Sequence, residues 1–217
     1  MGVYLFDFNG VLVDDERVHY AAMREVVARR GVVLDEATYV ARYFAFDDAT
    51  AFREMLRDGG VVHDERAVAE CVSEKLPIYM GVVEKELVMF EGGIELLRAC
   101  AERGPVAIVS GALRVEIEFA LRRASASVTT IVAAEDVAAC KPDPAGYLEA
   151  LRRLGVSAGD AVVIEDSVGG VAAARAAGCS VVAVAHSYPA VKLRDAQLVM
   201  AHIRELTVDA LDRVRAG

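Results

Sequence analysis

The sequence predicts an α/β protein in which an all-helical segment is inserted after the first strand of a parallel sheet. An apolar run from Val3 to Phe8 opens the chain and ends in a tight turn. A block from about Glu16 to about Glu86 then shows helical periodicity and no convincing strand. From about Phe90 onward, apolar runs alternate with helical segments of roughly 10 to 12 residues, a pattern typical of a parallel sheet with helices on both faces.

Apolar spacing and chain punctuation predict the helices of the inserted block. Val18, Ala22 and Val26 recur at helical intervals, and Gly31 is expected to end that helix. Three further helices are predicted, over about 35–43, 48–57 and 65–76. Pro77 is expected to end the last of them.

Short buried strands and helices are predicted for the rest of the chain. The expected strands are 105–109, 128–133, 161–164 and 180–185, with a further candidate at 198–200. The expected helices are 92–103, 113–123, 144–154, 168–177 and 208–215. The prediction is therefore a Rossmann-like parallel sheet core with helices on both faces, formed by residues 1–14 and 87–217, and a helical domain formed by residues 15–86.

Composition and charge argue against several classes of protein. The 24 basic and 33 acidic residues give 24 − 33 = −9, so nucleic acid and anionic membrane surfaces are not expected partners. No apolar run approaches the roughly 18 residues of a membrane-spanning helix, and no signal peptide is indicated, so we expect a cytoplasmic protein. The four cysteines form no C-x-x-C pair, so neither a zinc site nor a redox motif is indicated, and buried reduced thiols are expected. A monomer is favoured, although the sequence does not specify the oligomeric state.

Polar residues collect directly after the predicted strands. They are Asp7 and Asn9 after the first strand, Ser110 and Gly111 after the second, Lys141 in the loop after the third, and Glu165 and Asp166 after the fourth. Ligands of open parallel sheets bind beyond the carboxyl ends of the strands. Clustered carboxylates repel one another unless a cation neutralises them, and hard oxygen ligands select Mg²⁺. A lysine and a hydroxyl suit phosphate oxygens, so the set indicates metal-assisted phosphoryl transfer.

The chain carries four short motifs at these positions: Asp7-Phe8-Asn9-Gly10-Val11, Ser110-Gly111, Lys141-Pro142-Asp143 and Glu165-Asp166-Ser167. In order and spacing they resemble the motifs of the haloacid dehalogenase-like hydrolase superfamily, over essentially the whole chain. The helical insertion resembles the small cap of that superfamily. The stretch from Gly10 to Glu16, together with His19, resembles the β-phosphoglucomutase and sugar-phosphatase branch.

The resemblance implies a role for each motif residue. Asp7 would be the nucleophile that accepts the phosphoryl group as an aspartyl phosphate. Ser110 and the Gly111 backbone would hold phosphoryl oxygens, and Lys141 would neutralise developing charge. The implied Mg²⁺ ligands are Asp7, Asp166, the backbone carbonyl of Asn9, and Glu165 either directly or through water.

Asn9 departs from the pattern of the phosphotransferase members, which carry an aspartate there. That aspartate protonates the leaving oxygen and later activates water, and an amide can do neither. General acid–base catalysis is worth about 10² to 10⁴ in rate. The resemblance implies an Mg²⁺-dependent phosphatase of a small phosphorylated metabolite, with a sugar phosphate favoured. With Asn9 in this position, either the enzyme is slow, or its leaving group needs little protonation, or another acid substitutes. The alternatives are a phosphoglucomutase-like phosphotransferase and a catalytically weakened binding or regulatory homologue.

Several other polar groups are expected to play structural roles. Asp15-Glu16 is expected to be a solvated hinge, with the aspartate as an alternative acid for catalysis. Asp47-Asp48 is expected on a solvated helix face, and Gly169-Gly170 in close backbone packing. A phosphonatase would need a desolvated lysine in the helical domain, and nothing in the sequence marks Lys75 or Lys85 as desolvated.

Overall fold

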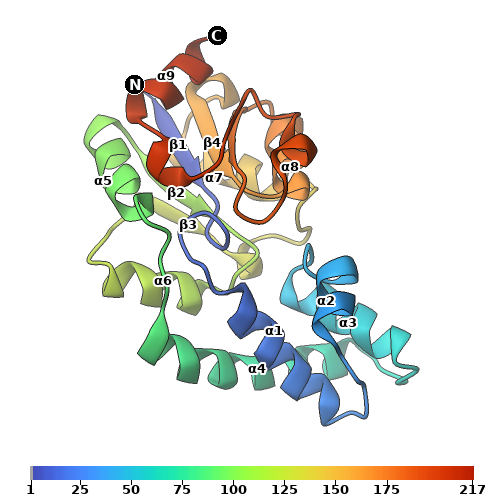
Figure 1. The fold of residues 1–217 in the computed structure, drawn as a ribbon. Helices are drawn as coiled ribbons and strands as arrows, with labels where there is room; N and C mark the ends of the chain where they lie inside the picture. The colour runs from blue at the N-terminus through green and yellow to red at the C-terminus, as the bar shows by residue number, and fades with distance from the viewer. Residues whose placement is uncertain (1) are drawn as a thin grey trace. The chain divides into compact units, whose positions relative to one another are not determined.

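Strand β1 (Val3–Phe6) lies in the middle of a six-stranded parallel sheet in the computed structural model, which describes residues 2–217 (Figure 1). The strand order is β3-β2-β1-β4-β5-β6. The other strands are β2 (Val106–Val109), β3 (Thr130–Val132), β4 (Ala161–Glu165), β5 (Ser180–Val184) and β6 (Leu198–Met200). Leu5 pairs with Ala107 on one side and with Val163 on the other. The strand order therefore reverses beside β1, where open α/β sheets bind their ligands.

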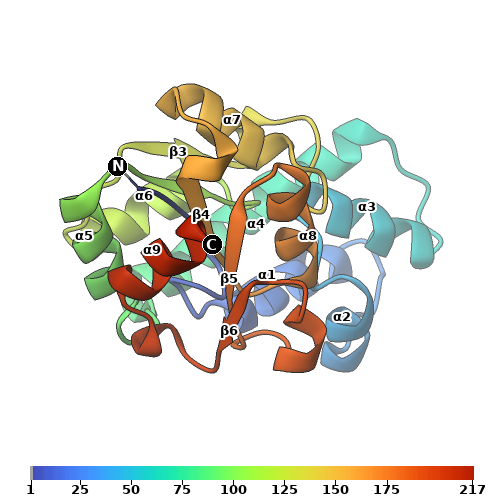
Figure 2. The same cartoon turned by 90° about the horizontal axis from the view of Figure 1, so that it is seen from above.

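Helices cover both faces of this sheet, and the predicted Rossmann-like architecture is confirmed. One face packs against α7 and α8 through a core that includes Leu5, Tyr147 and Ala174, while α5 and α9 cover the other face (Figure 2). The five α-helices that follow α4 (Glu65–Glu86) in the chain are α5 (Gly93–Arg103), α6 (Arg114–Arg123), α7 (Ala145–Leu154), α8 (Val168–Ala176) and α9 (Val208–Ala216). Because both faces are covered, β1 and β2 are buried at every position, which explains their uniformly apolar sequences.

The chain divides into two units, one formed by Met1–Asp14 with Met89–Gly217 and the other by Asp15–Val88. The first is the α/β unit just described. The second, the helical unit, contains α1 (Glu16–Ala28), α2 (Glu36–Arg42), α3 (Asp48–Asp58) and α4 (Glu65–Glu86). Asp35, Asp47 and Asp64 cap three of these helices by accepting backbone N–H bonds of the first turn. Such caps contribute about 0.5–2 kcal/mol each. The unit has its own apolar core around residues such as Phe52 and Val26.

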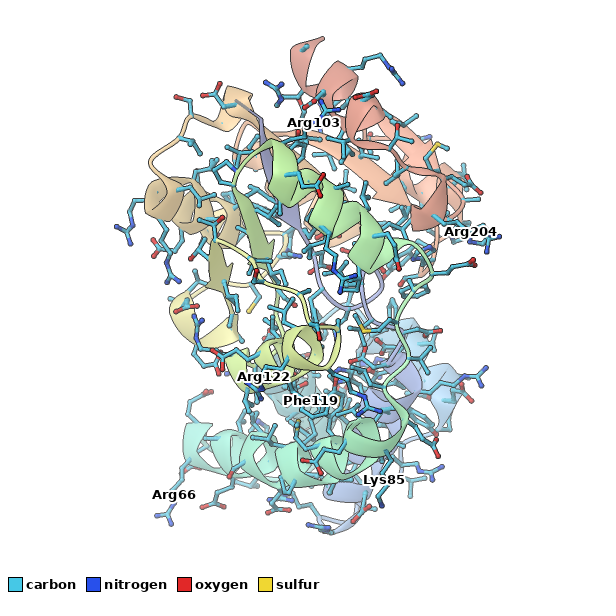
Figure 3. The ribbon with its side chains drawn as sticks, turned by 90° about the vertical axis from the view of Figure 1, so that its left-hand side faces the viewer. Arg66, Lys85, Arg103, Phe119, Arg122 and Arg204 are labelled. Atoms are coloured by element: carbon cyan, nitrogen blue, oxygen red, sulfur yellow. The ribbon has the colours of Figure 1, made fainter. Side chains whose placement is uncertain are left out.

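The expectation that Pro77 ends the last helix of this unit is wrong. Helix α4 runs for 22 residues with Pro77 inside it, and Figure 3 shows it as one continuous helix between Arg66 and Lys85. A proline within a helix removes one hydrogen bond and crowds the preceding turn, at a cost of about 3 kcal/mol. Burial of Tyr79 beyond the proline offsets this cost, since a buried aromatic side chain contributes a comparable amount. Within residues 2–217, no helix is both long and apolar enough to cross a membrane.

A buried polar network joins α1, α3 and α4 within the helical unit. Lys75 is 0% exposed, and its Nζ donates to the two carboxylate oxygens of Asp48 at 2.7 and 2.6 Å. The same nitrogen lies 2.6 Å from His19 Nδ1. The Asp15 carboxylate accepts a hydrogen bond from the Tyr79 hydroxyl and lies 3.2 Å from His19 Nε2.

This network corrects three expectations from the sequence. Asp15 is buried and therefore is not a solvated hinge residue. Asp48 forms an ion pair with the buried Lys75 and therefore does not lie on a freely solvated face. Lys75 is desolvated, which its sequence context did not indicate. Its ammonium pairs with Asp48, whereas Schiff-base chemistry requires a free amine.

Replacing Lys75 with methionine is expected to lower the free energy of unfolding by roughly 3–5 kcal/mol, because it leaves Asp48 without its buried cation. Urea unfolding followed by far-ultraviolet circular dichroism measures the loss. The matched control is Arg53→Gln, which breaks the exposed ion pair with Glu65 and should cost at most about 1 kcal/mol. Equal losses in the two variants would show that the buried pair stabilises the unit no more than a surface pair.

Candidate active site

Three carboxylates meet where the strand order reverses. Asp7 directly follows β1, Glu165 is the last residue of β4, and Asp166 follows it. One carboxylate oxygen from each residue lies within 4.8 Å of the others. All three residues are buried, with 7%, 0% and 4% of their surfaces exposed. The structure therefore brings together the three acids that the sequence places at separate strand ends.

Lys141 reaches this cluster from the loop that follows β3. Its Nζ lies 2.8 Å from Asp7 Oδ1 and 2.6 Å from Glu165 Oε1. It also donates to the backbone carbonyl of Val109 at 3.1 Å. These three acceptors match the three N–H donors of an ammonium group. One cation thus bridges two of the three buried acids.

The Glu165 carboxylate is surrounded by hydrogen-bond donors. Oε1 accepts from Lys141 and from the Tyr147 hydroxyl at 2.8 Å. Oε2 accepts from the backbone N–H groups of Asp166 and Ser167 and from the Ser167 hydroxyl, each at 3.0 Å. A carboxylate offers about four lone-pair sites. These contacts therefore use all the acceptor sites of the Glu165 carboxylate, which holds Lys141 and the end of β4 in place.

Two glycines leave room for the carboxylates. A Cβ at Gly170 would lie 1.7 Å from Glu165 Oε1, so a larger residue would displace that carboxylate. A Cβ at Gly10 would lie 1.8 Å from Asp166 Oδ2, and Gly10 also has a left-handed backbone conformation with φ of +75°. The expected close packing at Gly169-Gly170 is confirmed at Gly170, whereas Gly169 has only ordinary contacts.

Burial and mutual repulsion control the protonation of the cluster. Burial, and then the charge of Glu165, raise the pKa of Asp7 to about 7 against the opposing effect of Lys141. Burial, Glu165 and Asp7 raise the pKa of Asp166 well above its usual value. Burial also opposes ionisation of Glu165, but Lys141 and the hydrogen bonds to Glu165 lower its pKa overall. The negative charge of the cluster thus exceeds what Lys141 neutralises, which favours binding of a further cation.

Ser110 and Asn9 lie side by side at the neighbouring strand ends. Ser110 directly follows β2, and its hydroxyl donates to Asn9 Oδ1 at a distance of 3.4 Å. The same hydroxyl accepts the backbone N–H of Ala112 at 3.1 Å. Gly111 is exposed directly after Ser110. The Ser110 hydroxyl and the Asn9 amide therefore lie at the carboxyl ends of the strands, where Asp7 also lies.

Two contacts to the cluster come from residues that sequence reasoning did not select as site residues. Tyr147 of α7 donates to Glu165, and Ser187 donates to Asp166 Oδ2. Tyr147 lies on an amphipathic helix, where it resembles any aromatic core residue. Ser187 lies three residues beyond β5, so the rule that polar groups follow strand ends could have found it.

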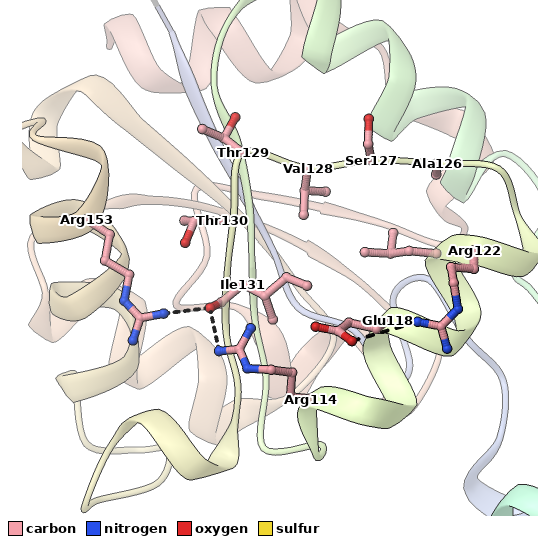
Figure 4. A pocket seen from close by; sticks show the side chains of 11 residues that line it. Arg114, Glu118, Arg122, Ala126, Ser127, Val128, Thr129, Thr130, Ile131 and Arg153 are labelled. Carbon is pink, nitrogen blue, oxygen red and sulfur yellow. Dashed lines mark hydrogen bonds and ion pairs between the residues drawn. The ribbon is translucent and has the colours of Figure 1, made fainter.

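A groove of about 440 Å³ lies along the edge strand β3, and its lining includes none of the candidate site residues (Figure 4). Arg114 and Arg153 donate to the carbonyl of Ile131 at 3.2 and 2.8 Å. Arg153 also pairs with Asp136 at 3.0 Å, and Arg114 pairs with the same carboxylate. Paired guanidinium groups on an edge-strand carbonyl shield the edge from other chains. The groove therefore has a structural explanation that needs no ligand.

Fold and site together define an α/β protein of the doubly wound type, with a helical unit inserted after β1 and a lysine-bridged acidic cluster at the switch point. Comparison with known proteins gives the family. The model of the haloacid dehalogenase-like hydrolases matches residues 1–178, so the chain belongs to that family.

Several relatives extend over nearly the whole chain. The validoxylamine A 7'-phosphate phosphatase of Streptomyces hygroscopicus subsp. limoneus is 29% identical over 208 residues, which cover 94% of this chain and 95% of that protein. Hexitol phosphatase A of Escherichia coli strain K12 is 28% identical, covering 94% and 93%. The crystal structure of CbbY from Rhodobacter sphaeroides in complex with phosphate aligns with a TM-score of 0.88 at 25% identity, covering 98% and 99%.

In metal-free solution, the contribution of Asp7 to the free energy of unfolding should fall as the pH rises from about 4 to about 7. The folded pKa of Asp7, about 7, exceeds the ordinary value of 3.8, so the stabilisation is complete below pH 4 and is lost as pH rises through 7. Asp7→Asn mimics the neutral acid and should be more stable than the wild type at pH 8 by about 1 kcal/mol or more.

Urea unfolding in a chelator at pH 4, 6 and 8 measures this difference. The matched control is Asp160→Asn, which replaces an exposed aspartate. A difference between Asp7→Asn and the wild type that stays constant with pH would contradict the raised pKa of Asp7.

Proposed function

We propose that the chain is an Mg²⁺-dependent phosphatase of a small phosphorylated metabolite, with a sugar phosphate as the favoured substrate class, and that it works through a phosphoryl-Asp7 intermediate. The main support for this proposal is the position of Lys141 Nζ, which lies 2.8 Å from Asp7 and 2.6 Å from Glu165. Asp166 supplies the third carboxylate of the same cluster. Full-length relatives that are phosphatases support it.

The donor set fits a magnesium ion. The carboxylates of Asp7 and Asp166 and the backbone carbonyl of Asn9 are hard oxygen ligands. Burial and the neighbouring charge of Glu165 raise the pKa of both acids, and a bound divalent cation would oppose both effects. When bound, Mg²⁺ would offset the repulsion between these carboxylates and a phosphoryl group and polarise the phosphoryl oxygens. Glu165, whose oxygens already accept from Lys141, Tyr147 and the start of α8, would act by holding Lys141.

The first chemical step forms a bond between an Asp7 carboxylate oxygen and phosphorus. The bond between phosphorus and the substrate oxygen breaks, and the leaving oxygen keeps the electron pair and takes up a proton from solvent. Lys141 holds its positive charge beside Asp7 Oδ1, where it stabilises charge that develops during transfer. Ser110 and the Gly111 backbone would hold the phosphoryl oxygens. In the second step, water attacks phosphorus and passes a proton to solvent, the bond between phosphorus and the Asp7 oxygen breaks, and inorganic phosphate and the free Asp7 carboxylate are released.

Asn9 weakens both proton transfers. Its amide can neither protonate the leaving oxygen nor deprotonate water, and its Oδ1 accepts from Ser110. Asp15, the alternative acid, is engaged by Tyr79 and lies beside His19 inside the helical unit. Slow hydrolysis of phosphoryl-Asp7 follows. Asn9 also favours a second candidate, a phosphate-binding homologue with little turnover.

Magnesium should raise the melting temperature of the wild type, because it binds the folded cluster and not the unfolded chain. At a concentration of one hundred times Kd, the increase should be roughly 5 to 10 °C. Asp166→Ala should abolish the increase, as measured by differential scanning fluorimetry. Asp143→Ala, which removes an exposed aspartate from the loop of Lys141, is the control and should retain it. A full magnesium shift in Asp166→Ala would refute the assignment of this ligand.

Asn9→Asp is expected to raise turnover of sugar phosphates by roughly 10² or more, because it restores a group for general acid–base catalysis. Phosphate release from a panel of sugar phosphates, with and without Mg²⁺, measures the change. The double variant Asn9→Asp with Asp7→Asn is the control and should be inactive. Unchanged or lower turnover would show that the amide belongs to a working mechanism. Sugar isomerisation without phosphate release would instead identify a mutase.

A further inference from the structure

His186 contacts the loop that carries the candidate nucleophile. It lies two residues beyond β5, with Nδ1 2.7 Å from the carbonyl oxygen of Gly10 and Nε2 3.2 Å from the backbone nitrogen of Ile203. A carbonyl can only accept and a backbone N–H can only donate, so Nδ1 carries the hydrogen and Nε2 accepts. Phe90 stacks on the ring with centroids 4.0 Å apart. Burial lowers the pKa of His186, which favours this neutral form.

Gly10 is therefore held on both sides of its Cα atom. Its N–H donates to the carbonyl of Val13 at 2.9 Å, and its own carbonyl accepts from His186. The Gly10 N–H and the Asn9 carbonyl belong to the same planar peptide group. The bond from the Gly10 N–H to Val13 therefore fixes the direction in which the Asn9 carbonyl oxygen points, and the bond from His186 holds the next peptide group, on the other side of the Gly10 Cα atom.

The residue next to His186 binds the opposite side of the cluster. The Ser187 hydroxyl donates to Asp166 Oδ2. A Cβ at Gly10 would lie 1.8 Å from that carboxylate oxygen and 2.8 Å from the Ser187 hydroxyl, so the Gly10 backbone packs directly against this pair. His186 thus contacts the turn after β1, and the adjacent Ser187 contacts the residue after β4, so the two residues link these segments.

We propose that His186 is a positioning residue, which holds the Asp7–Gly10 turn and the Asn9 carbonyl in the orientation that binds the divalent cation. The identity of that ion rests on the proposed function, whereas the position of the turn is a property of the metal-free protein. Residues that orient metal ligands typically change metal affinity by roughly 10- to 100-fold when replaced.

Two amide variants separate the two hydrogen bonds of the ring. His186→Asn places an amide nitrogen near the position of Nδ1 and keeps the donor to Gly10. His186→Gln places an amide oxygen near the position of Nε2, which keeps the acceptor for Ile203 and loses the donor to Gly10. Both variants lose the stacking of the imidazole ring on Phe90, so a difference between the two variants reports the hydrogen bond to Gly10 and not the lost packing.

Hydrogen–deuterium exchange of residues 6–13 in the metal-free protein should be faster in His186→Gln than in His186→Asn. Isothermal titration calorimetry with Mg²⁺ should show Kd weakened roughly 10- to 100-fold in His186→Gln and close to the wild-type value in His186→Asn. Equal exchange rates and equal Kd values in the two variants would overturn the proposal.

The wild-type protein provides an independent test if His186→Gln does not fold. The imidazole ¹⁵N chemical shifts should show hydrogen on Nδ1 and none on Nε2 of His186, and the opposite tautomer would overturn the proposal. Failure of the wild type to release phosphate would contradict the phosphatase function alone, because exchange and tautomer are measured without metal or substrate.

Discussion

The geometry of the candidate active site depends on the ion pairs that the ammonium group of Lys141 forms with two buried carboxylates. Burying carboxylates costs several kcal/mol per ion unless positive charge lies close by, and Lys141 bonds to both Asp7 and Glu165. Donors from Tyr147 and from the start of α8 occupy the rest of Glu165, which explains how a fully buried glutamate is tolerated. Asp7 and Asp166 keep raised pKa values. This remaining excess of negative charge is the physical reason to expect a divalent cation.

Much of the fold could be predicted because strands that are buried on both faces consist of short apolar runs. Val106–Val109 and Ala161–Glu165 stand out from the sequence for this reason. The length of α4 could not be predicted, because the local effect of Pro77 is outweighed by the burial of Tyr79, which is a tertiary contact. Local signals therefore located the elements, whereas packing determined where α4 ends.

The candidate site was predictable where strand order alone brings residues together. Asp7, Lys141 and Asp166 all lie beyond carboxyl ends of strands, and an open parallel sheet gathers such positions at one edge. The environments of Lys75 and Asp15 were not predictable. A lysine on an amphipathic helix has the same sequence context whether its ammonium lies in water or pairs with a buried carboxylate, and only the packing of the helical unit decides between them.

Phosphorylation of Asp7 is the central claim, and it can be observed directly. The protein would be mixed with an activated phosphate ester, such as a nitrophenyl phosphate, and Mg²⁺, quenched in acid within seconds, and analysed by intact-mass and peptide mass spectrometry. One phosphoryl group is expected on the peptide that contains Asp7, and it should persist longer than in Asn9→Asp because the amide does not activate water. Continued phosphate release with Asp7 unmodified, or with the phosphoryl group on another residue, would contradict the proposed mechanism.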